Sequence, residues 1–115
     1  MTAEENLPIM IEHSDGTTVL RPSGDVDLSG APELRARIAE VFSDPPARLV
    51  IDLSEVPYMD SSGVATLVEG MQLANHAGAI LVLAGMQDRV KSIFEIARLD
   101  TVFKIAEDLT SAKEL

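Results

Sequence analysis

The sequence predicts one α/β domain, with a mixed β-sheet of about five strands and helices packed mainly on one face. Short apolar segments rich in β-branched residues alternate with segments whose apolar residues recur at helical spacing, which is typical of a largely parallel sheet. The first two apolar segments are instead joined by the turn sequence Ser14-Asp15-Gly16, which predicts an antiparallel hairpin. A chain of 115 residues suffices for one core, so residues 1–115 are expected to form a single domain, with residues 1–6 loosely ordered.

The first part of the chain supplies the hairpin and a helix. Leu7–Glu12 and Thr18–Arg21 are expected to form its strands, and Pro22, which has no amide hydrogen, should mark a strand end or an edge. Ser29 is expected to cap the first helix. The buried stripe of that helix consists of Leu34, Ile38, Val41 and Phe42, and Asp44-Pro45-Pro46 ends it.

The middle of the chain contains the best-defined strand and helix. Leu49–Leu53 is an apolar run that suits a strand buried on both faces. The period then changes to that of a helix with one buried face, at Val64, Leu67, Val68, Met71 and Ala74. Asp60, Ser61 and Ser62 precede this stripe and are good N-cap residues, while Gly78 is a natural C-terminal cap.

The last part repeats the alternation. Ile80–Ala84 is expected to be a buried strand, and Val90, Ile93, Phe94 and Ala97 mark a third helix. Val102–Ile105 is expected to form a final short strand, and residues 107–115 a weak terminal helix.

Composition excludes several classes of function. The net charge of −10 argues against nucleic acid or anionic lipid as a partner. There is no cysteine, and His13 and His76 have no ligand-like spacing, so neither a metal nor another cofactor is expected. No signal peptide or membrane-spanning segment is recognisable, which indicates a cytoplasmic protein without membrane insertion.

The sequence also argues against an enzyme. Ser61-Ser62-Gly63 fits the second half of a nucleophile elbow, but Met59 stands where that elbow requires glycine. There is no glycine-rich phosphate loop followed by lysine. Asp52, at a strand end, is similar to the acceptor of a response-regulator receiver domain, but the acidic pair and the lysine of such a domain are missing. The receiver interpretation therefore remains a minor alternative.

Gly63 draws attention to the start of the second helix. A glycine in a first turn costs about 0.5–1 kcal/mol relative to alanine, so it needs a reason. One interpretation is access: without a side chain at residue 63, another protein can reach the neighbouring serine. On that interpretation Gly63→Leu should impair partner binding and leave the fold largely intact. The alternative is purely structural, with the Asp60 and Ser61 side chains serving as helix caps.

The segment Val56-Pro-Tyr-Met-Asp-Ser-Ser-Gly-Val64 resembles the STAS domains of bacterial anti-sigma factor antagonists. The resemblance continues in Gly24–Asp27 with Ala31–Arg35, and in Val90–Phe94 with Leu99–Phe103, so it covers nearly the whole chain.

This resemblance implies a switched binding protein. Family members bind an anti-sigma factor, often a serine kinase, and so release a sigma factor. Phosphorylation of the serine directly after the motif's Asp ends the interaction, and a serine phosphatase restores it. That serine is Ser61 here, with Ser62 as the alternative acceptor. The residues expected to bind the partner are Asp25, Asp27, Met59, Asp60, Ser62 and Gly63. Similar domains also serve as structural subunits of lipid-transport or sensory assemblies, which is the alternative function.

Overall fold

The computed structural model describes residues 7–115, so the expectation for residues 1–6 lies outside the described part. The strands are β1 (Ile9–Ser14), β2 (Thr17–Pro22), β3 (Arg48–Asp52), β4 (Ile80–Ala84) and β5 (Lys104–Ala106). The helices are α1 (Ala31–Val41), α2 (Ser61–Ala77), α3 (Asp88–Ile96), the 3₁₀ turn η1 (Leu99–Thr101) and the short α4 (Leu109–Ala112).

The five strands form one mixed sheet in the order β1-β2-β3-β4-β5. β1 is antiparallel to β2, whereas β3, β4 and β5 continue the sheet in parallel. The hairpin turn has Asp15 at φ 52° and Gly16 at φ 81°, and two such positive values suit a tight two-residue hairpin loop. Pro22 is the last residue of β2. The predicted mixed sheet and the strand end at Pro22 are both confirmed.

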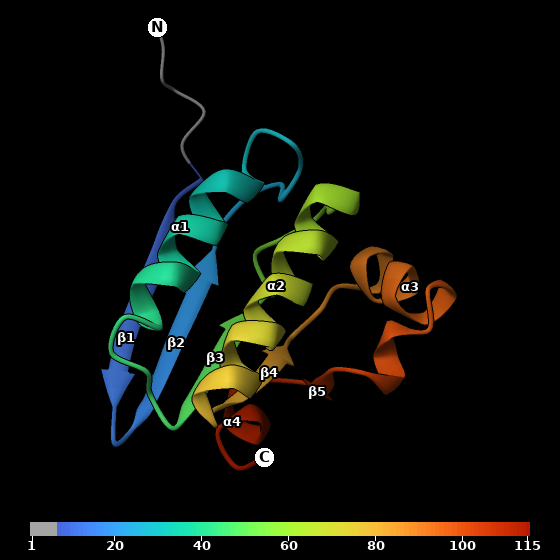
Figure 1. Cartoon of the computed structure of the whole chain (residues 1–115). Helices are drawn as coiled ribbons and strands as arrows, with labels where there is room; N and C mark the ends of the chain where they lie inside the picture. The colour runs from blue at the N-terminus through green and yellow to red at the C-terminus, as the bar shows by residue number, and fades with distance from the viewer. Residues whose placement is uncertain (1–6) are drawn as a thin grey trace, which may run out of the picture.

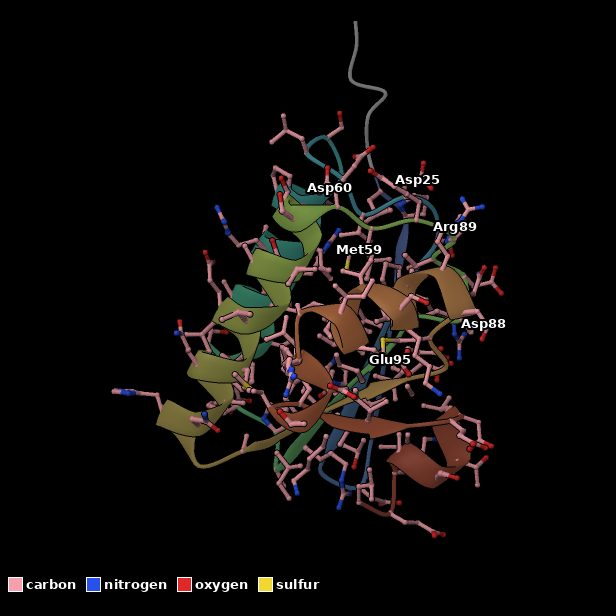
Figure 2. The ribbon with its side chains drawn as sticks, turned by 90° about the vertical axis from the view of Figure 1, so that its right-hand side faces the viewer. Asp25, Met59, Asp60, Asp88, Arg89 and Glu95 are labelled. Carbon is pink, nitrogen blue, oxygen red and sulfur yellow. The ribbon has the colours of Figure 1, made fainter. Side chains whose placement is uncertain are left out.

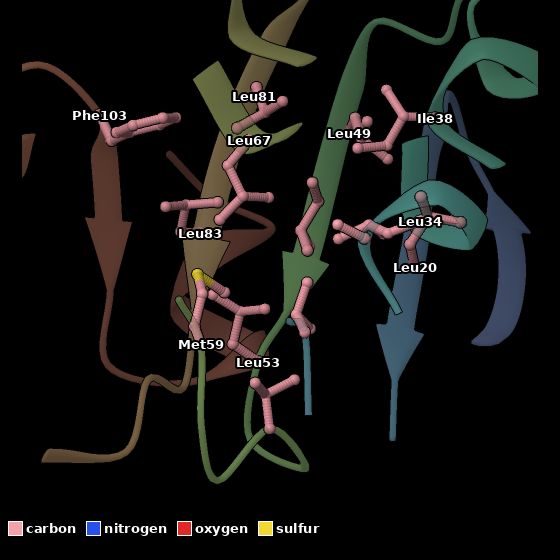
Figure 3. Packing of buried hydrophobic residues seen from close by; sticks show 14 of the residues in the cluster. Leu20, Leu34, Ile38, Leu49, Leu53, Met59, Leu67, Leu81, Leu83 and Phe103 are labelled. Atoms are coloured by element: carbon pink, nitrogen blue, oxygen red, sulfur yellow. The ribbon is translucent and has the colours of Figure 1, made fainter. Parts of the chain in front are cut away.

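The sheet has a large core on one face and a smaller one on the other. α1 and α2 run side by side across the first face, with α3 beside them (Figure 1). Leu20, Leu49 and Leu83 point into this core from three neighbouring strands (Figure 3). Alternate strand residues such as Val19, Val50 and Val82 point to the opposite face, where α4 packs. The expected placement of helices mainly on one face is confirmed.

The final strand begins later than the sequence predicts. The expected strand Val102–Ile105 is wrong at its start, because the amides of Val102 and Phe103 donate to the Leu99 carbonyl and continue a helical turn. Phe103 packs edge-to-face on Phe94 of α3, with ring centroids 5.6 Å apart. This aromatic contact takes residue 103 out of the strand, so β5 begins at Lys104.

None of the helices in the described part of the chain is long and apolar enough to cross a bilayer.

Candidate functional site

The start of α2 is fixed by the side chain of Asp60. Asp60 has an extended backbone conformation, and its Oδ1 accepts hydrogen bonds from the amides of Ser62 at 2.8 Å and Gly63 at 3.4 Å. These amides would otherwise have no acceptor in the first turn of the helix. The predicted N-cap is therefore confirmed. Ser61, the first residue of α2, is exposed beside this cap.

Gly63 is required by close packing rather than by access. It is buried, and a β-carbon on it would lie 2.5 Å from both Met59 Cγ and the carbonyl oxygen of Val26. Real β-carbons do not approach other heavy atoms so closely, and a backbone oxygen is not free to move aside. The expectation that Gly63 opens the surface beside Ser61, and that Gly63→Leu spares the fold, is wrong.

Met59 also lies beneath the site. Its side chain is 1% exposed and packs near Leu53 and Leu83 in the core (Figure 3). Direct partner contact, expected for Met59 from the sequence, is thus excluded by burial in this conformation. Met59 instead supports the turn that leads into Asp60.

The loop before α1 is attached to the segment before α2 through the main chain. Val26 and Met59 form an isolated parallel bridge, in which the Val26 amide donates to the Tyr58 carbonyl at 3.0 Å. The Asp60 amide in turn donates to the Val26 carbonyl at 3.3 Å. These bonds bring two segments far apart in the sequence to one end of the molecule, where Asp25 and Asp60 both lie (Figure 2).

The two loop aspartates have different roles. Asp27 Oδ1 accepts from the amides of Ser29 and Gly30, both at 3.0 Å, and so shapes the turn into α1. The expected Ser29 cap is wrong: the N-cap position is Gly30, which makes no side-chain cap bond. Asp27, three residues before Gly30, instead provides the carboxylate that accepts hydrogen bonds from the amides just before the helix. Asp25 is exposed and, among the described residues, its carboxylate makes no hydrogen bond.

A groove of about 370 Å³ runs between the N-terminal turns of α1 and α2. It is lined by Leu28, Ala31, Pro32, Arg35, Ser61, Ser62 and Ala65. Leu28, at its rim, is 76% exposed, so an apolar side chain borders the groove. Arg35 Nε lies 2.9 Å from Glu69 Oε1 in an exposed ion pair across the two helices.

Leu28 and Arg35 were not predicted to belong to the site. The available signal for Leu28 was a large apolar side chain in an otherwise polar loop, between Asp27 and Ser29. Arg35 had no comparable signal, because its position opposite Ser61 depends on how α1 packs against α2.

Comparison with known proteins identifies the family of this fold and site. The model of the STAS domain family matches residues 8–112. The chain belongs to the STAS domain family.

Similar proteins match this STAS domain over nearly their full length. An anti-sigma-B factor antagonist of Listeria monocytogenes is 31% identical over 101 residues, covering 87% of this chain and 89% of the relative. An anti-sigma-B factor antagonist of Staphylococcus aureus is 28% identical over 102 residues, covering 89% and 94%. The crystal structure of an anti-sigma factor antagonist from Mycobacterium paratuberculosis superposes with a TM-score of 0.87 at 26% identity, covering 99% and 97%.

Asp52, the acceptor in the receiver interpretation, has a structural role in this STAS domain. Its side chain is buried, and its Oδ2 lies 3.0 Å from Arg21 Nε while its Oδ1 accepts from the Ser54 amide at 3.0 Å. Burial alone would raise the pKa of Asp52, but the bonds from Ser54 and Arg21 outweigh it and hold the pKa below its ordinary value. The match of the STAS family model to residues 8–112 overturns the receiver interpretation, and Asp52 is here the ion-pair partner of Arg21.

Within residues 7–115, no group of three or more His, Cys, Asp or Glu side chains is placed to hold an ion. The chemistry available at the start of α2 is therefore that of an exposed hydroxyl, a carboxylate-capped helix end and a partly apolar groove.

Proposed function

We propose that this STAS domain is an anti-sigma factor antagonist whose binding is switched by phosphorylation of Ser61. Unphosphorylated, it binds an anti-sigma factor, which then releases its sigma factor. The observation that carries the proposal is the exposed Ser61 hydroxyl at the edge of the groove between α1 and α2. The names of the relatives supply the class of partner.

Ser61 is a better acceptor than Ser62. Ser61 is exposed, and among the described residues its hydroxyl makes no hydrogen bond that a kinase would have to break. Ser62 is half-buried, its amide is bound by Asp60, and its carbonyl accepts from the Thr66 hydroxyl at 3.0 Å. Because Ser62 is half-buried, a kinase would reach its hydroxyl less readily than that of Ser61.

The expected free energies favour a switch in which phosphorylation weakens partner binding at the surface and does not unfold the domain. A phosphate on Ser61 adds about −1.5 to −2 charges beside Asp60. The positive end of α2 offsets part of that repulsion, by about 0.3–1 kcal/mol, so the fold should tolerate the modification. A complex that covers Ser61 would have to desolvate the dianion. An uncompensated buried charge costs several kcal/mol, which lowers affinity about a hundredfold or more.

The proposal specifies the remaining participants. The domain is a binding protein rather than an enzyme, so the phosphate comes from a partner, in the simplest case an anti-sigma factor with serine kinase activity. A serine phosphatase removes it. Nucleic acid is not a partner at a net charge of −10. The site of action is the cytoplasm, and the partner surface includes the exposed Asp25 together with Ser62 and the rim of the groove.

Phosphorylation and calorimetry test the proposal. Incubated alone with ATP and magnesium, the protein should remain unmodified, and with the cognate kinase it should gain one phosphate on Ser61. Ser61→Ala should bind the anti-sigma factor and resist inactivation, whereas Ser61→Asp should bind weakly at an almost unchanged melting temperature. Ser62→Ala is the matched control and should be switched off normally. Equal affinities of Ser61→Ala and Ser61→Asp would refute the switch.

A further inference from the structure

We infer that Arg35 is the internal counter-ion of the phosphorylated domain: when Ser61 carries a phosphate, the Arg35 guanidinium leaves Glu69 and pairs with that phosphate. This inference rests on the proposed phosphorylation of Ser61 and adds how the free phosphorylated state is stabilised. Arg35 is the one cationic side chain among the described residues that line the groove.

The positions on the two helices make the exchange geometrically direct. Ser61, Ala65 and Glu69 are spaced by four residues and so form one stripe on α2, with steps of about 6 Å along the helix axis. Arg35, on α1, lies across from this stripe. Without a phosphate it pairs with Glu69, the residue of the stripe farthest from Ser61. The middle position is Ala65, whose small side chain leaves the path from Glu69 to residue 61 open.

The present pair is bidentate but open to water: Arg35 Nε lies 2.9 Å from Glu69 Oε1, and Arg35 Nη2 donates to Glu69 Oε2 at 3.1 Å. The side chains of Arg35 and Glu69 are 56% and 49% exposed, and ion pairs so open to water contribute little to stability. Glu69 remains solvated when Arg35 leaves it. A phosphate offers a higher charge than a carboxylate and the same fork-like geometry for the guanidinium, so Arg35 should prefer it.

The movement of Arg35 from Glu69 to the phosphate would also affect partner binding. Before phosphorylation, Glu69 keeps Arg35 at the far end of the stripe, and the groove beside Ser61 stays open to a partner. After phosphorylation, Arg35 and the phosphate would together occupy the groove between α1 and α2. The free phosphorylated domain would thereby gain stability that the complex does not share, which moves the equilibrium away from binding.

Titration of an installed phosphoserine tests this without any kinase. Phosphoserine is incorporated at position 61 during translation, and its second pKa, ordinarily about 6, is read by phosphorus NMR. Asp25 and Asp60, which lie at the same end of the molecule as residue 61 (Figure 2), raise this pKa, and Arg35, which lines the groove together with Ser61, lowers it. Arg35→Gln should raise the phosphate pKa by about half a unit, a threefold change in proton affinity.

Two further variants make the result decisive. Arg37→Gln is the matched control, because Arg37 lies on the same helix and pairs with Glu33 and Glu40 but does not line the groove. It should leave the phosphate pKa nearly unchanged. Glu69→Gln, which releases Arg35, should lower it. Circular dichroism checks that each variant folds.

The outcomes separate this inference from the proposed function. A phosphate pKa that is the same in the parent protein and in Arg35→Gln, or that moves equally in Arg37→Gln, would overturn the role of Arg35 and leave the switch at Ser61 standing. A clear shift in Arg35→Gln supports the counter-ion even if the native kinase modifies another residue, a result that would refute only the proposed function.

Discussion

Gly63→Ala should destabilise the domain, although it replaces glycine with the best helix former. The new β-carbon would lie 2.5 Å from the Val26 carbonyl oxygen, which is held by its hydrogen bond from the Asp60 amide. Relieving that contact requires α2 to move away from the loop before α1. Overpacking of this kind costs about 1–3 kcal/mol, and the gain in helix propensity returns about 0.5–1 kcal/mol. The mid-range values leave an expected net loss of about 1 kcal/mol.

Gly70→Ala is the matched control for this prediction. Gly70 is also a buried glycine of α2, but its β-carbon would meet only the ends of the Ile38 and Leu81 side chains, at 3.4 Å. Its helix propensity should therefore dominate, with stabilisation of up to about 1 kcal/mol. Urea unfolding and thermal melting of both variants decide the matter, since about 1 kcal/mol corresponds to a shift on the order of 4 °C. Equal stability of Gly63→Ala and the parent protein would refute the packing argument.

Three further predictions concern the cap, the groove rim and the buried carboxylate. Asp60→Ala should cost about 1 kcal/mol in urea unfolding, because the Ser62 and Gly63 amides lose their acceptor; an unchanged midpoint would count against the cap. Leu28→Ala should leave stability within about 0.5 kcal/mol but weaken anti-sigma factor binding about tenfold, whereas Ile96→Ala, 83% exposed and outside the groove, should bind normally. The folded pKa of Asp52 is lowered, so its contribution to stability is complete above the unfolded pKa of about 3.9 and is lost as the pH falls through the folded pKa. The parent protein should therefore lose stability below about pH 4 more steeply than Asp52→Asn, and parallel curves would contradict this.

Local patterns were sufficient to predict most of the fold. The positive-φ turn at Asp15-Gly16, the apolar run Leu49–Leu53 and the cap residue Asp60 each act through neighbours in the sequence, and all three form as expected. The errors occurred where tertiary contacts override local preference. Phe103 packs on Phe94 instead of continuing a strand, and neither residue's own neighbours in the sequence indicate this.

The candidate site was predictable only in part for the same reason. Ser61 and Asp60 follow from helix-capping rules and were identified from the sequence. The role of Gly63 could not be deduced, because the atom it avoids belongs to Val26, far away in the chain. Likewise, Leu28 and Arg35 enter the site only through the packing of α1 on α2.

The main-chain bonds between Val26 and the Tyr58–Asp60 segment bear on how related modules acquire different partners. Since the peptide groups that join the two walls of the groove are common to every amino acid, their bonding survives replacement of the outward-facing side chains. The rim residue Leu28 can therefore vary while the hydroxyl of Ser61 keeps its position. A gene duplicate could diverge in recognition at the rim and retain a working phosphorylation site, so paralogous signalling pathways in one cell could become insulated from one another through few substitutions.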